Sequence, residues 1–290
     1  MRLPQTAALF TATLLAILLQ TPCARAGDDV EEQLRAGYLD KVLTLRHFFK
    51  GDHLSFQPDG SLIGVGEIGP WTLDGQVLVK GMEVSPHTLR IQGRRVCLIF
   101  DAKGKPYRDI LALLDELKTE NRDKMESDFL DNSVEIEIAL VSGKPDLREA
   151  SSAIDAVFLK PGESLADILP DYWRDYFDQI EGQPRIVRHT TEKVYYVGPG
   201  SGISAPRVTF TPEPEFSVEA RKAKYQGKVV VSLVVNSSGS VGDLAITSPV
   251  GMGLDEKAVA AVRSWKFEPA TKDGKPVPVH IAVEVDFHLY

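Results

Sequence analysis

Hydrophobic and polar residues alternate most regularly in the last quarter of the chain, residues 215–290. Its final run, residues 277–289, places Val, Ile, Phe or Leu at every second position, with polar or small residues between them. This period of two is typical of a strand with one buried face. Two β-branched runs, residues 228–236 and 241–247, flank a Ser-Ser-Gly-Ser turn and predict a hairpin.

Two helices are expected around this hairpin. Residues 217–225 have a short helical pattern, and Gly227 follows it as a residue suited to ending a helix. Residues 255–264 have a longer one, with Leu254, Ala258 and Val262 on one face. Asp255 stands in the first turn, where a carboxylate favours the helix N-terminus.

The first 180 residues mix both periods. A helical pattern covers residues 28–49, and Pro170 divides or kinks a later helical pattern over residues 163–177. Further helices are expected at 106–120 and 146–158, and strands at 53–57, 61–65, 76–84, 88–91, 95–100 and 134–140. The predicted fold class is α+β. An N-terminal domain with an antiparallel sheet and helices precedes a small C-terminal domain with an antiparallel sheet and two helices.

Composition shifts place the domain boundaries. Residues 184–214 hold Pro-Gly-Ser-Gly stretches without a sustained apolar period, and this predicts a linker. The expected organisation is a signal peptide at 1–26, an acidic α+β domain at 27–183, the linker at 184–214 and the C-terminal domain at 215–290. Residues 27–184 carry 30 acids and 18 bases, whereas residues 215–290 carry nine of each. Neither part has a basic patch, so nucleic-acid binding is not expected.

The first 26 residues have the pattern of an export signal. Arg2 precedes an apolar run at 7–19, and Ala24-Arg-Ala26 resembles a cleavage site. Thirteen residues span only about 20 Å as a helix, less than the ~30 Å hydrocarbon core. Cleavage and a periplasmic location are therefore expected. If the segment is not cleaved, it anchors the protein in the inner membrane.

We found no pattern that predicts catalysis, a cofactor or a metal. Residues 64–69 match G-x-G-x-x-G by letter, but Pro70 and Gly75 predict a turn where a phosphate-binding helix would have to begin. His280 and His288 share one strand face but stand about 26 Å apart, too far for one metal. An acidic stripe, Asp167, Asp171, Asp175 and Asp178, is interpreted as a solvated helix face, with a divalent-cation site as the alternative.

The last quarter resembles the C-terminal domain of the TonB family of energy transducers. The residues that carry the resemblance are Ala220-Arg221, Tyr225-Gln-Gly-Lys-Val-Val-Val231, Asn236-Ser-Ser-Gly-Ser-Val241, Gly253-Leu-Asp-Glu-Lys-Ala258, Ala261-Val-Arg-Ser-Trp-Lys-Phe-Glu-Pro-Ala270 and Gly274-Lys-Pro-Val277. The resemblance covers about a quarter of the chain. It implies a protein that is not an enzyme and needs no cofactor. It also implies an outer-membrane transporter of the TonB-dependent type as partner, together with a proton channel of the ExbB–ExbD type.

In that family the last long strand pairs with a short extended segment of the transporter, which is β-augmentation. Carried over by position, the partner-binding residues are expected to be Val279, His280, Ile281, Ala282, Val283, Glu284, Val285 and Asp286. Two alternatives stay open. The strand can be core structure, for instance in a homodimer. Alternatively, the chain is a periplasmic enzyme or ligand-binding protein whose activity lies in residues 27–183, with the C-terminal domain as its docking module.

Overall fold

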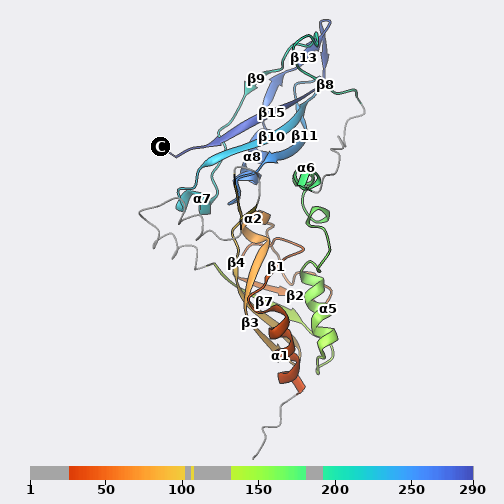
Figure 1. Ribbon diagram of the computed structural model, residues 1–290, viewed down its shortest axis with the longest axis vertical. Helices are drawn as coiled ribbons and strands as arrows, with labels where there is room; N and C mark the ends of the chain where they lie inside the picture. The colour runs from red at the N-terminus through yellow and green to blue at the C-terminus, as the bar shows by residue number, and fades with distance from the viewer. Residues whose placement is uncertain (1–25, 102–105, 108–131, 181–191, 290) are drawn as a thin grey trace, which may run out of the picture.

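The structure is a computed structural model that describes residues 26–101, 106–107, 132–180 and 192–289. Figure 1 shows an elongated molecule with one of its two larger sheets in each half along the long axis. The elements of the first half of the chain form the lower sheet and its helices. The last hundred residues form the upper sheet. The α+β fold class expected from the sequence is confirmed.

The lower sheet has five strands in the order β1-β3-β4-β7-β2. Their bounds are β1 Val42–Thr44, β2 His53–Phe56, β3 Gln76–Ser85, β4 Thr88–Arg95 and β7 Ser133–Ala139. The β1–β3, β3–β4 and β4–β7 pairs are antiparallel, as expected, but the edge strand β2 runs parallel to β7. The sheet is therefore mixed rather than a simple meander.

Helix α1, Ala26–Tyr38, packs on this sheet through the buried side chains of Val30 and Leu34. The predicted continuation of the helix to residue 49 is wrong. Asp40 has a φ of 58°, which ends the helix, and its N–H donates to the carbonyl of Val79 at 3.0 Å. Residues 42–44 then form strand β1, which pairs with β3. A tertiary backbone ladder thus overrides the local helical period.

Two other predicted strands are absent or short. Residues 61–65 form only a single bridge between Phe56 and Leu62, because Gly64 at a φ of 100° turns the chain away. The predicted strand 95–100 is divided: Arg95 ends β4, and Ile99–Phe100 form β5, which pairs with β6 at Pro106–Tyr107. Most of the predicted helix 106–120 lies outside the described residues. The turn predicted between Pro70 and Gly75 is a four-residue helix, α2 at Trp71–Asp74, which follows the glycine-rich stretch.

The two helices expected after β7 are present. Helix α5, Leu147–Val157, begins at Asp146, whose carboxylate accepts the N–H of Glu149 at 2.8 Å. Pro170 separates a short 3₁₀ turn, η1 at Leu165–Asp167, from α6 at Asp171–Ile180, as predicted. Helix α6 packs against β11 of the upper sheet. The N-terminal part therefore supplies a helix to the C-terminal half.

The upper sheet has the order β11-β10-β15-β8. Its strands are β8 Tyr195–Tyr196, β10 Gly227–Val235, β11 Val241–Ser248 and β15 Val279–Phe287, and α7 Val218–Lys222 and α8 Leu254–Arg263 are its helices. Two small pairs complete this half, β9 Arg207–Phe210 with β12 Lys266–Glu268, and β13 Ala270–Lys272 with β14 Lys275–Val277. The predicted hairpin, helix and final strand are confirmed.

A loop between β11 and α8, residues 249–253, holds the two halves together. The N–H of Met252 donates to the carbonyl of Leu98 at 2.9 Å, and the N–H of Phe100 donates to the carbonyl of Val250 at 3.1 Å. These two bonds extend the backbone pairing around β5 into the C-terminal half. The halves are therefore joined by main-chain hydrogen bonds as well as by side chains.

Two glycines allow this close approach. Gly253 donates its N–H to the hydroxyl of Thr72 at 2.9 Å, and its φ is 72°. Gly251 has a φ of 91°, and a Cβ at this position would lie 2.2 Å from the carbonyl oxygen of Leu98. A side chain cannot fit at that distance, so the loop requires glycine for both its conformation and its contact.

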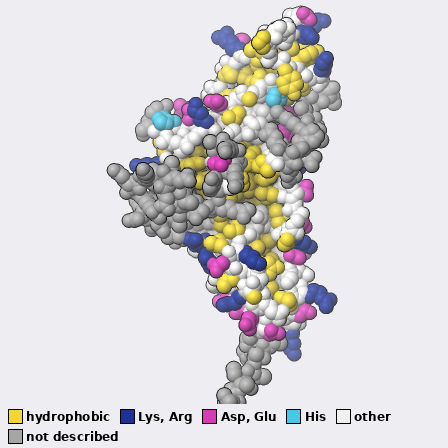
Figure 2. All heavy atoms as spheres, in the orientation of Figure 1, with side chains coloured by type: hydrophobic (Ala, Val, Ile, Leu, Met, Phe, Trp, Pro, Cys, Tyr) yellow, Lys and Arg dark blue, Asp and Glu magenta, His cyan; other side chains and the backbone are white. Residues whose placement is uncertain are grey.

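An aromatic cluster fills the junction between the two halves. Figure 2 shows hydrophobic side chains gathered in a band across the middle of the molecule, where the halves meet. The ring centroids of Trp173 in α6 and Trp71 in α2 lie 5.2 Å apart, edge to face. The indole N–H of Trp173 donates to the carboxylate of Glu256 at 3.1 Å. The remaining members of the cluster are Phe100, Tyr176 and Phe177. The buried side chains of both halves form one continuous core.

One buried carboxylic acid, Asp255, and two half-buried ones, Asp74 and Glu256, lie beside this junction. Asp255 accepts the N–H groups of Val250 and Gly251 at 2.8 and 2.7 Å, which fixes the loop. Burial raises the pKa of Asp255 well above its usual value, and the neighbouring Glu256 adds to the effect. Burial also raises the pKa of Glu256 to about 7 and that of Asp74 to about 6. Ionising these groups therefore costs more in the folded protein than in water.

Candidate functional site

Strand β15 is covered along one edge and open along most of the other. Strand β10 pairs with its whole length in antiparallel register, from Val279 opposite Val235 to Phe287 opposite Gly227, without a shift. On the second edge, β8 pairs in parallel with Val279 and His280 alone. Within the described part of the chain, no strand pairs with the second edge of residues 281–287.

The two faces of β15 differ as the alternating pattern predicts. Val279, Val285 and Phe287 are buried in the core, with at most 2% of each exposed. Ile281 and Val283 belong to the same face but are only half-buried. Apolar side chains are therefore incompletely covered along the middle of the strand, next to its open edge.

The opposite face of β15 is exposed and charged. Ala282, Glu284 and Asp286 all stand on it. Lys228 of β10 lies beside the two carboxylates, with its Nζ 3.5 Å from Glu284 and 3.7 Å from Asp286. Two acids and one base leave this face with an excess negative charge.

The direction of the backbone groups follows from the contact with β8. The N–H of Tyr195 donates to the carbonyl of Pro278 at 2.9 Å, so this carbonyl points toward β8. In a strand the N–H and C=O of every second residue point to the same side. The backbone groups of Ala282, Glu284 and Asp286 therefore point to the open edge, and those of the odd-numbered residues face β10.

The structure thus sorts the eight partner-binding residues predicted from the sequence into three groups. Val279 and His280 already pair with β8. The odd-numbered residues 281–285 give half-buried or buried side chains to the core face. Ala282, Glu284 and Asp286 present both exposed side chains and outward backbone groups, so they are the accessible part of the edge.

Strand β8 was not predicted from the sequence. Tyr195 and Tyr196 lie in the predicted linker, because the surrounding stretch is rich in Pro and Gly. The run Val194-Tyr-Tyr-Val197 carries four residues that favour strands, which was the available signal. Further along, Ser204 N donates to the carbonyl of Thr271 at 2.9 Å, and β9 pairs with β12. The described part of the predicted linker therefore lies along the C-terminal half.

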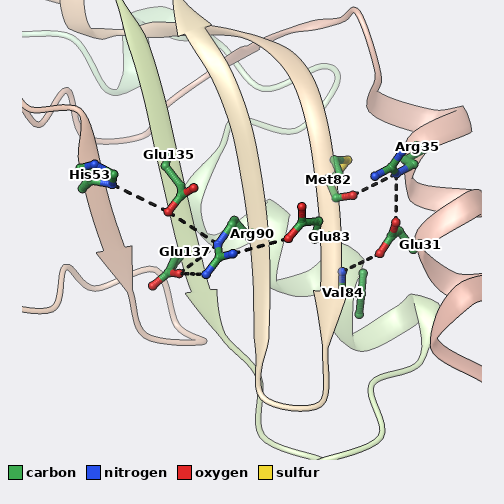
Figure 3. Close-up of polar contacts among 9 residues, drawn as sticks. All are labelled: Glu31, Arg35, His53, Met82, Glu83, Val84, Arg90, Glu135 and Glu137. Atoms are coloured by element: carbon green, nitrogen blue, oxygen red, sulfur yellow. Dashed lines mark hydrogen bonds and ion pairs between the residues drawn. The ribbon is translucent and has the colours of Figure 1, made fainter.

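A second group of charged side chains lies on the lower sheet. Figure 3 shows a charged network on the outer face of the lower sheet, where Arg90 lies among Glu83, Glu135 and Glu137. The Arg90 guanidinium is 2.8 Å from Glu137 and 3.6 Å from Glu135, and His53 lies 3.8 Å from Glu135. The network is partly exposed, and each carboxylate has a basic partner. Among the described residues, no three His, Cys, Asp or Glu side chains are placed to hold a metal ion.

The predicted signal segment, residues 1–26, lies almost wholly outside the described residues. Where the structure does describe the chain, no helix is both long and apolar enough to cross a membrane. The side chain of Cys97 is a free thiol that is buried in the core. Burial raises the pKa of this thiol and keeps it protonated.

Comparison with known proteins gives matches to the C-terminal half. Residues 212–289 match the family model for the Gram-negative bacterial TonB protein C-terminal region. The chain is 33% identical over 79 residues to the protein tonB2 of Pseudomonas aeruginosa, which covers 27% of this chain and 29% of that protein. It is 31% identical over 77 residues to the protein TonB of Xanthomonas campestris, covering 26% and 34% of the two chains.

A third relative is the protein TonB of Vibrio cholerae, 31% identical over 78 residues, with 27% of this chain and 32% of that protein covered. The chain thus spans about a third of the length of these relatives. Among solved structures, the solution NMR structure of the Pseudomonas aeruginosa TonB C-terminal domain is similar at 22% identity and a TM-score of 0.27, covering 33% of this chain and 93% of that domain.

Proposed function

We propose that this chain, whose residues 212–289 form a C-terminal domain of the TonB family, is a periplasmic transducer-type protein that binds an outer-membrane transporter. The transporter contributes a short extended segment, which adds to the upper sheet as a further strand beside β15. The observation that carries this proposal is the second edge of residues 281–287, which no described strand covers.

Backbone hydrogen bonds supply the affinity in this mode of binding. Ala282, Glu284 and Asp286 each offer an N–H and a C=O on the open edge. An incoming strand satisfies these groups in the way that β8 satisfies the carbonyl of Pro278. An open edge of this length is a hazard for aggregation unless charged side chains protect it or a partner uses it. Glu284 and Asp286 protect the edge in the free protein, and the half-buried Ile281 and Val283 beside it support its use by a partner strand.

The half-buried side chains strengthen the argument. A strand placed beside Ile281 and Val283 covers their remaining apolar surface with alternate apolar residues of its own, which contributes about 25 cal/mol for each Å² removed from water. On the other face, the partner meets Glu284 and Asp286. Polar or basic side chains suit that face, and acidic ones are repelled.

Energised transport also requires a connection to the inner membrane. We assign this role to the apolar run at residues 7–19, provided that it stays uncleaved, and a proton channel of the ExbB–ExbD type is then the second partner. Mass spectrometry of the membrane fraction tests this assignment. Intact protein beginning at Met1 would support this assignment against the cleavage that the sequence favours. A chain that begins only at Gly27 restricts the function to docking without transmitted force.

A pull-down tests the strand pairing. The full chain is immobilised and incubated with detergent-solubilised outer-membrane proteins of the same organism, and captured transporters are identified by mass spectrometry. The informative variant is Ala282→Pro, which removes one N–H from the open edge. Because the Ala282 N–H faces away from β10, this change leaves the β10 ladder intact.

The matched control is Ala282→Val, which keeps the N–H and favours a strand. We expect Ala282→Pro to lose transporter capture by about tenfold, since one lost backbone bond and a restricted chain together cost about 1–2 kcal/mol. The control keeps its binding. Equal capture by both variants means that the β15 edge is not the contact.

A further inference from the structure

The segment from Tyr195 to Phe210 is fastened to the C-terminal half at three places. β8 pairs with the start of β15, and β9 pairs with β12. Between them, Ser204 and Thr271 exchange backbone and side-chain hydrogen bonds of 2.8–2.9 Å. We name residues 195–210 the strap. The contacts of its later residues hold β8, at its N-terminal end, in position.

Side chains add to the hold of β8. The ammonium groups of Lys272 and Lys193 lie 4.9 and 5.3 Å from the ring centroid of Tyr195. The ring of Tyr196 lies 5.4 Å from that of His280. Cation–π and ring contacts of this kind are favourable even at exposed positions. β8 is therefore fixed by more than its short backbone ladder.

The strap has a consequence for any strand that docks on β15. A partner that extends past Ile281 toward Val279 must remove β8 from the edge. It then makes the backbone hydrogen bonds that β8 made before, so that their number does not change. The contacts of Tyr195 and Tyr196 are lost in the exchange. Extension beyond residue 281 therefore brings no gain in affinity.

We propose that β8 is a fixed stop that limits the docking edge to the seven residues 281–287 and so selects a partner strand of about that length. This inference rests on the proposed function, because it defines the length of the same site. Seven strand residues span about 23 Å. The partner chemistry that fits is an extended segment, apolar beside Ile281 and Val283, and neutral or basic beside Glu284 and Asp286.

The test uses the full chain with a probe strand of known sequence. A two-residue Asn-Gly turn and an alternating Thr-Val strand are appended after Tyr290, so that the strand folds back along the open edge at a high effective concentration. Three lengths are compared, which reach Val283, Ile281 and Val279. Hydrogen exchange is measured at the amide of Ala282, which the two longer probes cover and which the shortest probe, ending at Val283, leaves open as the baseline.

In the native chain we expect the protection of Ala282 to rise as the probe is lengthened to Ile281. Lengthening it to Val279 should then change the protection by less than about twofold. The double variant Tyr195→Gly and Tyr196→Gly removes both ring contacts, so that β8 no longer stays on the edge. In this variant the last lengthening should raise the protection about tenfold, as expected for two backbone bonds gained on an edge that β8 has left. The control Val197→Gly, next to β8, should behave like the native chain.

The outcomes separate the two proposals. If the longest probe gains as much in the native chain as in the double variant, β8 is not a stop, but the edge is still a docking site. If no probe length protects Ala282 in any variant, the edge does not accept a strand, and the proposed mode of transporter binding fails together with the stop.

Discussion

Replacing Gly251 by alanine should separate the two halves of the molecule at their main-chain contact. A Cβ at this position would lie 2.2 Å from the carbonyl oxygen of Leu98 and 2.7 Å from the Cα of Ile99. Both neighbours are backbone atoms and cannot rotate away. The loop 249–253 must therefore move away from the backbone of these two residues.

The magnitude follows from two contributions. A residue other than glycine at a φ of 91° costs about 1–2 kcal/mol. Moving the loop breaks the hydrogen bonds from Met252 to Leu98 and from Phe100 to Val250, each worth about 1 kcal/mol. We expect Gly251→Ala to lower the free energy of unfolding by about 3–4 kcal/mol.

Urea unfolding of the full chain, followed by far-UV circular dichroism, measures this loss. Tryptophan fluorescence reports on the junction itself, because Trp71 and Trp173 meet there. The matched control is Gly200→Ala, where φ is 78° and nothing lies within 4 Å of an added Cβ. The control should lose only about 1–2 kcal/mol. An equal loss in the two variants would refute the close contact between the halves.

Three further predictions concern single side chains. Burial raises the pKa of Glu256 to about 7, so the folded state binds the proton more tightly than the unfolded chain does. The free energy of unfolding should therefore fall as the pH rises from about 4.5 to 7. In thermal melts, the melting temperature of Glu256→Gln should depend less steeply on pH than that of the native chain. Ser217 caps α7 and donates to the carbonyl of Met252 at 2.6 Å, so Ser217→Ala should cost about 1–2 kcal/mol in urea unfolding, whereas Ser217→Thr should retain most of the stability. Arg90→Ala breaks the partly exposed pair with Glu137 and should lower the free energy of unfolding by less than about 1 kcal/mol in the same assay. A larger loss would contradict the interpretation of this network as a solvated face.

Local pattern was sufficient where one face of an element meets a core. The alternation over residues 277–289 predicted which side chains of β15 turn inward, because neighbouring side chains of a strand point to opposite faces. The Ser-Gly turn predicted the β10–β11 hairpin for a similar reason. Gly239 at a φ of 79° adopts a turn conformation that other residues avoid.

Local pattern was insufficient where a distant strand competes for the backbone. The helical period over residues 28–49 is present in the sequence, yet residues 42–44 form β1 because β3 offers them a ladder. Such a partner is separated by more than thirty residues, and no window of the sequence contains it. The same limit applies to β8, whose partner strand β15 begins 84 residues further on (279 − 195).

By itself, the sequence determined the α+β class, the hairpin, helices and final strand of the C-terminal half and the residues that line that strand, because periodicity and turn residues act over a few positions. Only the tertiary structure decided which part of that strand is accessible. Strand β8 covers Val279 and His280, and the alternation of hydrogen-bonding groups directs Ala282, Glu284 and Asp286 outward. The tertiary structure also joined the halves through Gly251. A strand has an open edge where no other strand pairs with it. Which strands pair is decided by the packing of the whole chain rather than by local pattern.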